Sequence, residues 1–508
     1  MFLFEAVNKA KSFDAEAVIK AWDGMEYNGL MGKQIMRACD HQALMLGPVA
    51  ESQAKSTLFP SPFPGTPVII PMDKLAVPIK DTGTRDVNRQ ENLKIKEEEA
   101  MKSKVTAGIG VAILMLATIF SPSLGKAAEP IKMLALDPIS GVMKDVGDRY
   151  HLGIKFAVEE INAAGGLLGR PIKMFYDDSQ VKPDIAVRKA SRYISEEKVQ
   201  FIMTGTGTHV AKAMAQVAEK EKVIMINYGA AGDELTGKDF TPYHFRIALS
   251  TGQQSGALAA YFANTQYKKY YILCQDYAFG HDVAEAFKKT MNKLKPGWQL
   301  VGEDYHPLGA KDLGPYISKI IASGAEVLIT GNWGSDIQVL VKQGAGLGLK
   351  AKIGNYFLSD PVHLQAIGDA AVGHITAEIY MLTEDTPQNK AFIDRWTKRK
   401  MDPDHPYPAF VIGKSYQAFM FMIEAIKKAK STKAEDVIKA WEGMSYDGLV
   451  GRMSMRACDH QVVTPISVAE ILPGPGPYYK FPFVGKPNMI PADKGAVPPA
   501  ETGNPRCK

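Results

Sequence analysis

From residue 131 onward, short apolar runs alternate with longer amphipathic stretches. Ile131–Ser140 ("IKMLALDPIS") has the pattern of a strand that ends in a polar loop, and Val146–Gly166 carries apolar residues at helical spacing before a glycine stop. The strand-and-loop unit recurs in "QFIMTGTGTH", "VIMINYGAAGDEL", "KYYILCQDYAFG", "EVLITGNWGSD" and "AKIGNYFLSD", each before a predicted helix. This alternation predicts an α/β protein with parallel sheets covered by helices on both faces.

A second series of these units begins between Phe245 and Gly256. We therefore predict two doubly wound lobes, with chain crossovers near Leu249 and near Ile375–Leu382. The predicted boundaries assign residues 129–249 and 376–460 to lobe 1, and residues 250–375 and 461–508 to lobe 2. Residues 129–508 number about 380, and a chain of that length is expected to form two lobes rather than one core.

The first hundred residues repeat a later part of the chain. "MRACDHQ" occurs at 36–42 and again at 455–461, and residues 1–51 match residues 420–470 at 31 of 51 positions when the two segments are paired in order. After a shift of one residue the match resumes, with 70–83 facing 490–503. We interpret residues 1–100 as a partial duplicate of residues 420–503 plus a linker, and not as a functional domain.

Residues 101–128 have the three-part layout of a secretory signal peptide. Lysines follow Met101, an apolar run spans Val105–Phe120, and small residues precede Glu129. The apolar run is shorter than the ~20 residues that span a bilayer. We expect cleavage after Ala127 or Ala128 and a periplasmic mature protein.

Composition describes an ordinary globular protein, with 46% hydrophobic and 23% charged residues. The net charge is only +5 and no basic stripe with interleaved aromatic residues is present, so no nucleic-acid partner is expected. Cys458 and Cys507 are candidates for a disulfide, although the sequence alone does not establish it. The chain has no C-x-x-C motif and no clustered histidines, so we expect no metal and no cofactor. We expect a monomer.

The loops after the predicted strands combine glycine, small polar residues and aromatic residues. Backbone N–H groups at helix starts, with the hydroxyls of Thr206, Thr208 or Thr236, suit a carboxylate or another anion. Phe279, Trp333, Tyr356 and Phe357 offer flat apolar walls. Because ligands bind beyond the carboxyl ends of such strands, these loops predict a small-molecule cleft between the lobes.

Four motifs resemble the leucine/isoleucine/valine-binding protein family, the periplasmic solute-binding components of ABC transporters. They are "AVEEINAAGGLLGRPIKMFYDD" (157–178), the "TGTGT" loop, "DYAFG" and "IGDAAVG" (367–373), and the resemblance covers essentially residues 129–470. It implies a type I periplasmic binding protein with two flavodoxin-like lobes and a three-crossing hinge. It also implies a membrane permease as partner and no enzymatic activity.

By this resemblance, Thr208 and the N–H groups near Gly207 and His209 hold a ligand carboxylate, with Ala230 and Ala231 adding further N–H groups. Phe279 and Trp333 match aromatic lids of the family. The expected ligand-binding set contains no catalytic residue and no metal ligand: Ser140, Thr206, Gly207, Thr208, His209, Ala230, Ala231, Phe279, Trp333, Tyr356 and Phe357.

The sequence departs from the family at Tyr356. Amino-acid binders in the family place a glutamate near this point to take the ligand's ammonium group, and an unpaired ammonium in a closed cleft would cost several kcal/mol. Either Asp360 or Asp336 replaces that glutamate, or the ligand is not an α-amino acid. We favour the second interpretation, with an aromatic acid, a short organic acid or a neutral polar solute as ligand.

Alternatives remain for the motif and for the function. "RACDHQ" could supply a Cys–His nucleophile or metal ligands, but Asp459 and His460 are better interpreted as hinge or turn residues, because neighbouring strand residues point to opposite faces. The main functional hypothesis is a transport receptor whose lobes close around one solute. The alternative is a sensing module of the same fold for an amide or amino acid, regulating a signalling partner. An enzyme ranks third, because no nucleophile–base pair is evident.

Overall fold

The computed structural model describes part of residues 2–70 and the continuous stretch 128–507; the described ranges before residue 128 are 2–11, 14–23, 25–29, 32–36, 43–44, 47–49, 52–53, 63–64 and 68–70. The chain divides into two compact units, Met1–Ser123 and Leu124–Lys508. Residues 85–100, which follow the last repeated segment and form the predicted linker, lie outside the described residues, as does nearly all of the predicted signal peptide at 101–128.

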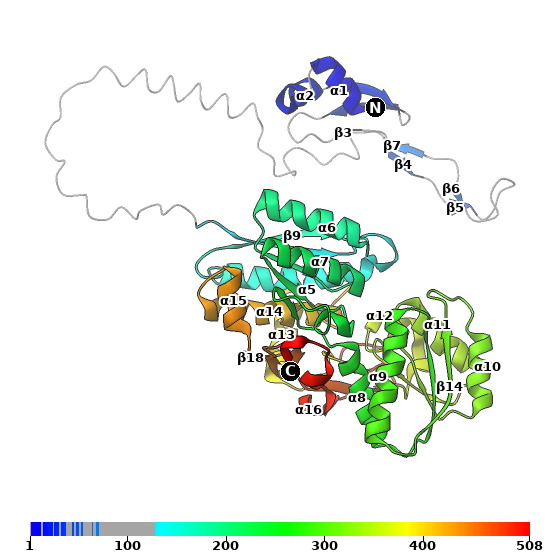
Figure 1. The fold of residues 1–508 in the computed structure, drawn as a ribbon. Helices are drawn as coiled ribbons and strands as arrows, with labels where there is room; N and C mark the ends of the chain where they lie inside the picture. The colour runs from blue at the N-terminus through cyan, green and yellow to red at the C-terminus, as the bar shows by residue number, and fades with distance from the viewer. Residues whose placement is uncertain are drawn as a thin grey trace, which may run out of the picture. The chain divides into compact units, whose positions relative to one another are not determined.

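The first sheet of the larger unit is parallel and has the strand order β12-β11-β10-β8-β9. Its strands are β8 (Ile131–Asp137), β9 (Ile172–Asp178), β10 (Phe201–Thr204), β11 (Ile224–Asn227) and β12 (His244–Arg246). The helices of this lobe are α5 (Lys144–Ala163), α6 (Pro183–Arg192), α7 (Thr208–Glu221), α13 (Pro387–Arg399), α14 (Val411–Ala429) and α15 (Ala434–Trp441). Figure 1 shows α6 and α7 beside this sheet.

The second sheet has the order β14-β13-β15-β16-β17-β21-β22, with β23 also paired to β21. Its strands are β13 (Lys269–Gln275), β14 (Gln299–His306), β15 (Val327–Ile329), β16 (Lys352–Asn355), β17 (Ile375–Glu378), β21 (Ile466–Leu472), β22 (Phe483–Val484) and β23 (Asn488–Ile490). Its helices are α8 (Thr251–Ala263), α9 (Ala278–Leu294), α10 (Gly314–Ser323), α11 (Ser335–Gly346) and α12 (Pro361–Ile367). The strands from β21 onward pair antiparallel, which the alternation of strands and helices did not predict.

The strands are apolar because helices cover both faces of each sheet. All four residues of β10 and all four of β11 are buried, as expected for central parallel strands. One hydrophobic cluster contains Phe156, Phe245, Tyr270 and Trp441, and so continues from the first lobe into the second. The predicted two-lobed α/β fold is confirmed.

Before its final segment, the chain crosses between the lobes three times. The first crossing follows β12 and ends at Ser250, which caps α8 together with Gln253. The second lies at 379–386, between β17 of the second sheet and α13 of the first lobe. The third lies at 464–465, between β20 (Val462–Val463), which pairs with β19 (Gly451–Met455), and β21.

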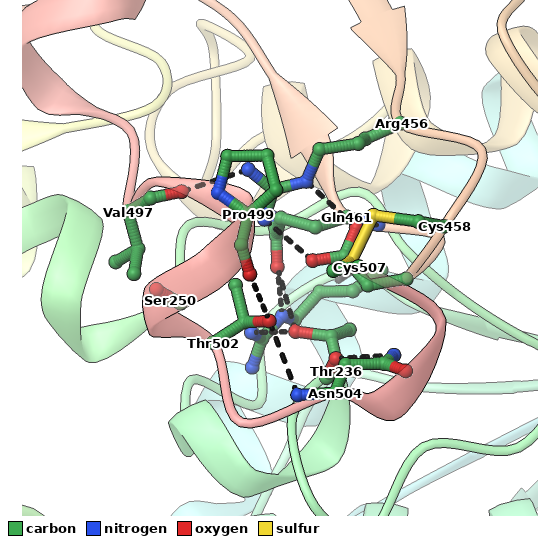
Figure 2. Close-up of polar contacts among 12 residues, drawn as sticks. Thr236, Ser250, Arg456, Cys458, Gln461, Val497, Pro499, Thr502, Asn504 and Cys507 are labelled. Carbon is green, nitrogen blue, oxygen red and sulfur yellow. Dashed lines mark hydrogen bonds and ion pairs between the residues drawn. A yellow bond between two sulfur atoms is a disulfide. The ribbon is translucent and has the colours of Figure 1, made fainter.

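The final segment returns from the second lobe to the first. It contains the short helix α16 (Ala492–Gly495), which packs on α8, and the single turns η6 (Pro499–Glu501) and η7 (Pro505–Cys507). Arg456 donates to the Val497 carbonyl at 2.7 Å, and Asn504 donates to the Thr236 carbonyl at 3.0 Å. Figure 2 shows these residues together. Cys507 forms a disulfide with Cys458, so the candidate cysteine pair is bonded. These contacts place the end of the segment, which the sequence assigned to lobe 2, against lobe 1.

The described elements of residues 2–70 follow the order of the elements in residues 421–490, with β4 (Gly47–Val49) and β5 (Ser52–Gln53) both matching parts of β21. Each of the first five elements lies 419 positions before its counterpart (421 − 2 = 419). The pairs are α1 (Phe2–Ala10) with the end of α14, α2 (Ala15–Trp22) with α15, β1 (Glu26–Gly29) with β18 (Ser445–Gly448), β2 (Gly32–Met36) with β19, and β3 (Ala43–Leu44) with β20. The registers agree as well, since Glu26 faces Ile35 and Ser445 faces Ser454. That residues 1–100 have no function of their own stays a prediction.

Among the described residues, no helix combines the length and apolar character that a membrane crossing requires.

We expect the Cys458–Cys507 disulfide to stabilise the larger unit measurably. It joins two residues that lie 49 positions apart in the sequence. A disulfide that closes a loop of this length contributes about 2–4 kcal/mol to the free energy of unfolding, largely by restricting the unfolded chain. The Cys458→Ser/Cys507→Ser variant should therefore melt at a lower temperature in calorimetry. As a control, dithiothreitol should lower the Tm of the parent protein and leave that of the variant unchanged. A Tm equal to that of the parent would contradict the expectation.

Candidate functional site

A cavity of about 610 Å³ lies between the two lobes, at the carboxyl ends of the parallel strands. Lobe 1 contributes the start of α5, the loop from Gly205 to the start of α7 and the loop 229–232 after β11. Lobe 2 contributes the loops that lead into α9, α11 and α12. The cavity therefore lies where the sequence predicted the cleft.

Nine of the eleven expected ligand-binding residues line this cavity: Thr206, Gly207, Thr208, His209, Ala230, Ala231, Phe279, Trp333 and Phe357. Ser140 and Tyr356 do not. The exposed Ser140 hydroxyl donates to Asp178. Tyr356 has no exposed surface and its hydroxyl lies 3.0 Å from that of Ser255, so it belongs to the core.

The fully buried carboxylate of Asp137 holds the "TGTGT" loop. It accepts hydrogen bonds from the Gly205 N–H at 2.8 Å, from the Thr206 hydroxyl at 3.4 Å and from the Tyr228 hydroxyl. Gly207 then adopts a φ of 85°, which glycine tolerates best, and α7 begins at Thr208. This arrangement turns the start of α7 toward the cavity.

The start of α7 leaves backbone donors available to an anion. The N–H groups of Thr208, His209 and Val210 have no acceptor four residues earlier within the helix, and the helix dipole favours negative charge there. The Thr208 hydroxyl accepts a hydrogen bond from the Gly232 N–H at 3.2 Å and so joins the two loops. The Ala230 N–H already donates to the Asn227 side chain at 2.8 Å, which leaves it less available than the resemblance implied. The exposed His209 ring donates to the Val181 carbonyl at 3.0 Å.

Aromatic side chains from both lobes form the apolar walls. In lobe 2, the Phe279 and Phe357 rings lie 6.1 Å apart, and the Trp333 indole N–H donates to the Tyr277 hydroxyl at 2.7 Å. Tyr150 and Phe410 of lobe 1 also line the cavity, and the sequence analysis missed both. Tyr150 follows a predicted helix pattern rather than a loop signal, so only its place in the fold identifies it.

Two buried ion pairs cross between the lobes at the cavity. Arg149 of α5 binds Asp360, the residue before α12, through two hydrogen bonds of 2.9 Å, and Lys414 of α14 binds Glu378 of β17. The side chains of Arg149 and Asp360 are 3% and 1% exposed, so both charges are shielded from water. Burial alone would raise the pKa of the Asp360 carboxyl, but the neighbouring Arg149 holds it below its usual value.

Neither acid considered as a substitute for the missing glutamate is free. Asp360 is paired with Arg149, and Asp336, which is 1% exposed, accepts hydrogen bonds from the Gln275 side chain at 2.8 Å and the Gly309 N–H at 2.9 Å. Glu234 and Asp282 line the cavity instead, and their carboxylates form no hydrogen bond or ion pair with the described residues. Sequence reasoning missed both, because they lie on a short turn and on a helix rather than at a strand end.

Asp282 of lobe 2 faces acidic residues of lobe 1. Burial and, to a smaller extent, the charges of Glu234 and Asp233 together raise the pKa of the Asp282 carboxyl to about 6. The negative potential at this point of the cavity favours a proton or a cationic group.

Comparisons with known proteins agree with this architecture. A model of the family described as periplasmic binding protein matches residues 130–475. The Leu/Ile/Val-binding protein homolog 4 of Brucella abortus is 28% identical over 386 residues, which cover 73% of this chain and 90% of that protein. The leucine-, isoleucine-, valine-, threonine-, and alanine-binding protein of Pseudomonas aeruginosa is 27% identical over 335 residues, which cover 65% and 87%. The closed conformation of the protein of that name from Brucella ovis has a TM-score of 0.67 and 26% identity, covering 73% of this chain and 97% of that one.

Two doubly wound lobes, three crossings and a cleft at the strand ends define the class of hinged, two-lobed binding proteins. The chain belongs to the periplasmic binding protein family, because the family model matches more than half of it. The predicted resemblance to the leucine/isoleucine/valine-binding proteins is confirmed by the relatives.

We expect the Arg149–Asp360 pair to be strongly coupled. Asp360→Asn keeps a residue that caps α12 but removes the buried counter-ion of Arg149, which retains only its 2.7 Å ion pair with the half-exposed Asp145; this should cost about 3 kcal/mol of unfolding free energy. The double variant Arg149→Met/Asp360→Leu removes both charges and should lose less than the single variant. Urea denaturation of the parent and the three variants, including Arg149→Met alone, measures this; additive losses would contradict it.

We expect Asp282→Asn to raise stability in a pH-dependent way. Because the folded pKa of Asp282 lies near 6 and the unfolded value near 3.8, its charged form destabilises the folded state above pH 6, and this penalty disappears as the pH falls below 4. The Tm of Asp282→Asn should exceed that of the parent at pH 8, and the two should converge at pH 4. The matched control is Asp369→Asn, which removes an exposed carboxylate outside the cavity. The difference between its Tm and that of the parent should be the same at pH 8 and pH 4.

Proposed function

We propose that the chain is the extracytoplasmic solute-binding receptor of an ABC importer and has no enzymatic activity. The solute is a small molecule with a carboxylate and an apolar or aromatic body, and the lobes close around it. A membrane permease is the partner that receives the loaded form.

The single observation that carries this proposal is the combination of groups in the 610 Å³ cavity. One wall presents the N-terminus of α7, where three backbone N–H groups and the helix dipole suit a carboxylate. The opposite lobe presents Phe279, Trp333 and Phe357, which suit an apolar body. Neither wall alone surrounds a ligand, so both lobes are needed to enclose it.

This division explains how binding drives closure. A ligand stabilises the closed form only to the extent that it binds that form better than the open form. A carboxylate held by lobe 1 gains its contacts with the aromatic residues of lobe 2 only when the lobes approach. The relatives named for leucine, isoleucine and valine support a carboxylate-bearing ligand for this chain.

Blocking the anion site should abolish binding of carboxylates. Thr208→Glu places a negative charge at the start of α7, where it repels the ligand's carboxylate and occupies its donors. In a thermal-shift screen of amino acids, aromatic acids and short organic acids, a bound ligand at a hundredfold excess over Kd adds about 2.7 kcal/mol of stability. We expect at least one carboxylate to stabilise the parent protein and none to stabilise Thr208→Glu.

The matched control is Lys182→Glu, which places the same charge before α6 and outside the cavity. It should keep the response of the parent. Binding of amides in preference to the corresponding carboxylates, or equal responses in Thr208→Glu and the parent, would refute the anion site.

A further inference from the structure

Gln254 is the one described side chain that both lines the cavity and has a buried polar atom without a partner. The residue is only 4% exposed, its Oε1 has no hydrogen-bond partner among the described residues, and its Nε2 donates no hydrogen bond to them. A buried amide in this condition lowers the stability of the fold unless another molecule completes its hydrogen bonds. Its place in the cavity wall makes the solute the candidate for that molecule.

The first turn of α8 brings Gln254 next to the anion site. Thr251 donates to the Ala231 carbonyl from its N–H at 2.9 Å and from its hydroxyl at 3.2 Å. The neighbouring Gly232 N–H donates to Thr208 at the start of α7. The loop at 231–232 therefore contacts the start of α8 and the start of α7. Gln254 lies three positions after Thr251, and residues at this spacing share a helix face.

The adjacent glutamine shows the contrast. Gln253 accepts a hydrogen bond from the Ser250 N–H at 2.8 Å and donates to the Val462 carbonyl at 3.0 Å, so its amide is used within the protein. Two consecutive glutamines thus have different environments. Gln253 fixes the hinge crossing, whereas Gln254 keeps its hydrogen-bonding capacity.

We propose that Gln254 determines specificity: its amide turns to bring the now covered Oε1 into the cavity, where this oxygen accepts from a hydrogen-bond donor on the carbon next to the solute's carboxylate. This inference rests on the proposed carboxylate site. The cleft accordingly selects carboxylic acids with an α-ammonium or α-hydroxyl group over the unsubstituted acids, because both groups donate to an amide oxygen. Glu234, which lines the cavity without an ion pair, adds attraction for an ammonium group.

Matched ligands and a matched variant test this role. The probes are two series with constant skeletons: phenylalanine, 3-phenyllactate and 3-phenylpropionate, and leucine, 2-hydroxy-4-methylvalerate and 4-methylvalerate. Gln254→Met keeps the length of the side chain and removes its polar atoms. Calorimetric titration should show that Gln254→Met binds the α-substituted acids about tenfold more weakly, while its affinity for the unsubstituted acids is unchanged. Within each series, preference for the ammonium over the hydroxyl member identifies the group.

The control is Gln417→Met. Gln417 has no exposed surface and no partner for either polar atom among the described residues, but it lies on α14 outside the cavity. It should leave all affinities unchanged, and the Tm of unliganded Gln254→Met should not fall below that of the parent. Equal weakening for every acid, or no weakening, would overturn the role of Gln254 and leave the carboxylate site intact. If none of the six acids binds the parent, this inference fails, whereas the proposed function fails only if no carboxylate of the wider thermal-shift screen binds.

Discussion

The bidentate ion pair between Arg149 and Asp360 joins the two lobes inside the cavity wall. Its residues lie 211 positions apart, and each charge would be costly in this environment without the other. Lys414 and Glu378 form a second buried pair between the lobes. Together these pairs neutralise four buried charges at the cavity. The groups that remain for a solute are backbone N–H groups, aromatic faces, the Gln254 amide and the acids Glu234 and Asp282, which are unpaired among the described residues.

The sequence predicted the parts of the site that follow from local pattern. Loops after buried strands are recognisable by glycine and threonine, and all parallel strands end at one edge; Thr206–His209, Phe279 and Trp333, which were expected at the cleft for this reason, line the cavity. Tyr356 was not, because the first residue after a strand can point to either side, and here its hydroxyl meets Ser255 in the core. Arg149, Glu234 and Gln254 lie on helices or turns without such signals, and only the tertiary structure brings them to the cleft.

The repeated segment separates what local sequence determines from what the body of the protein determines. Its two copies share helices, strands and registers, so these features follow from the sequence of the segment itself. In the larger unit, the same segment also buries Trp441 in the core and contributes Gln461, which donates to the Ala248 carbonyl at the first crossing. Those contacts involve residues distant in sequence, and no pattern within the segment encodes them.

The Cys458–Cys507 disulfide changes the connectivity of the molecule as well as its stability. The chain leaves lobe 1 after Cys458, forms β21, β22 and β23 in lobe 2, and returns to lobe 1 at Cys507. These residues and the disulfide form a closed covalent ring that passes through both lobes. A single backbone cut in the third crossing would therefore leave β21 to β23 attached to lobe 1 through the returning segment. The lobes share one more covalent path than a three-stranded hinge provides.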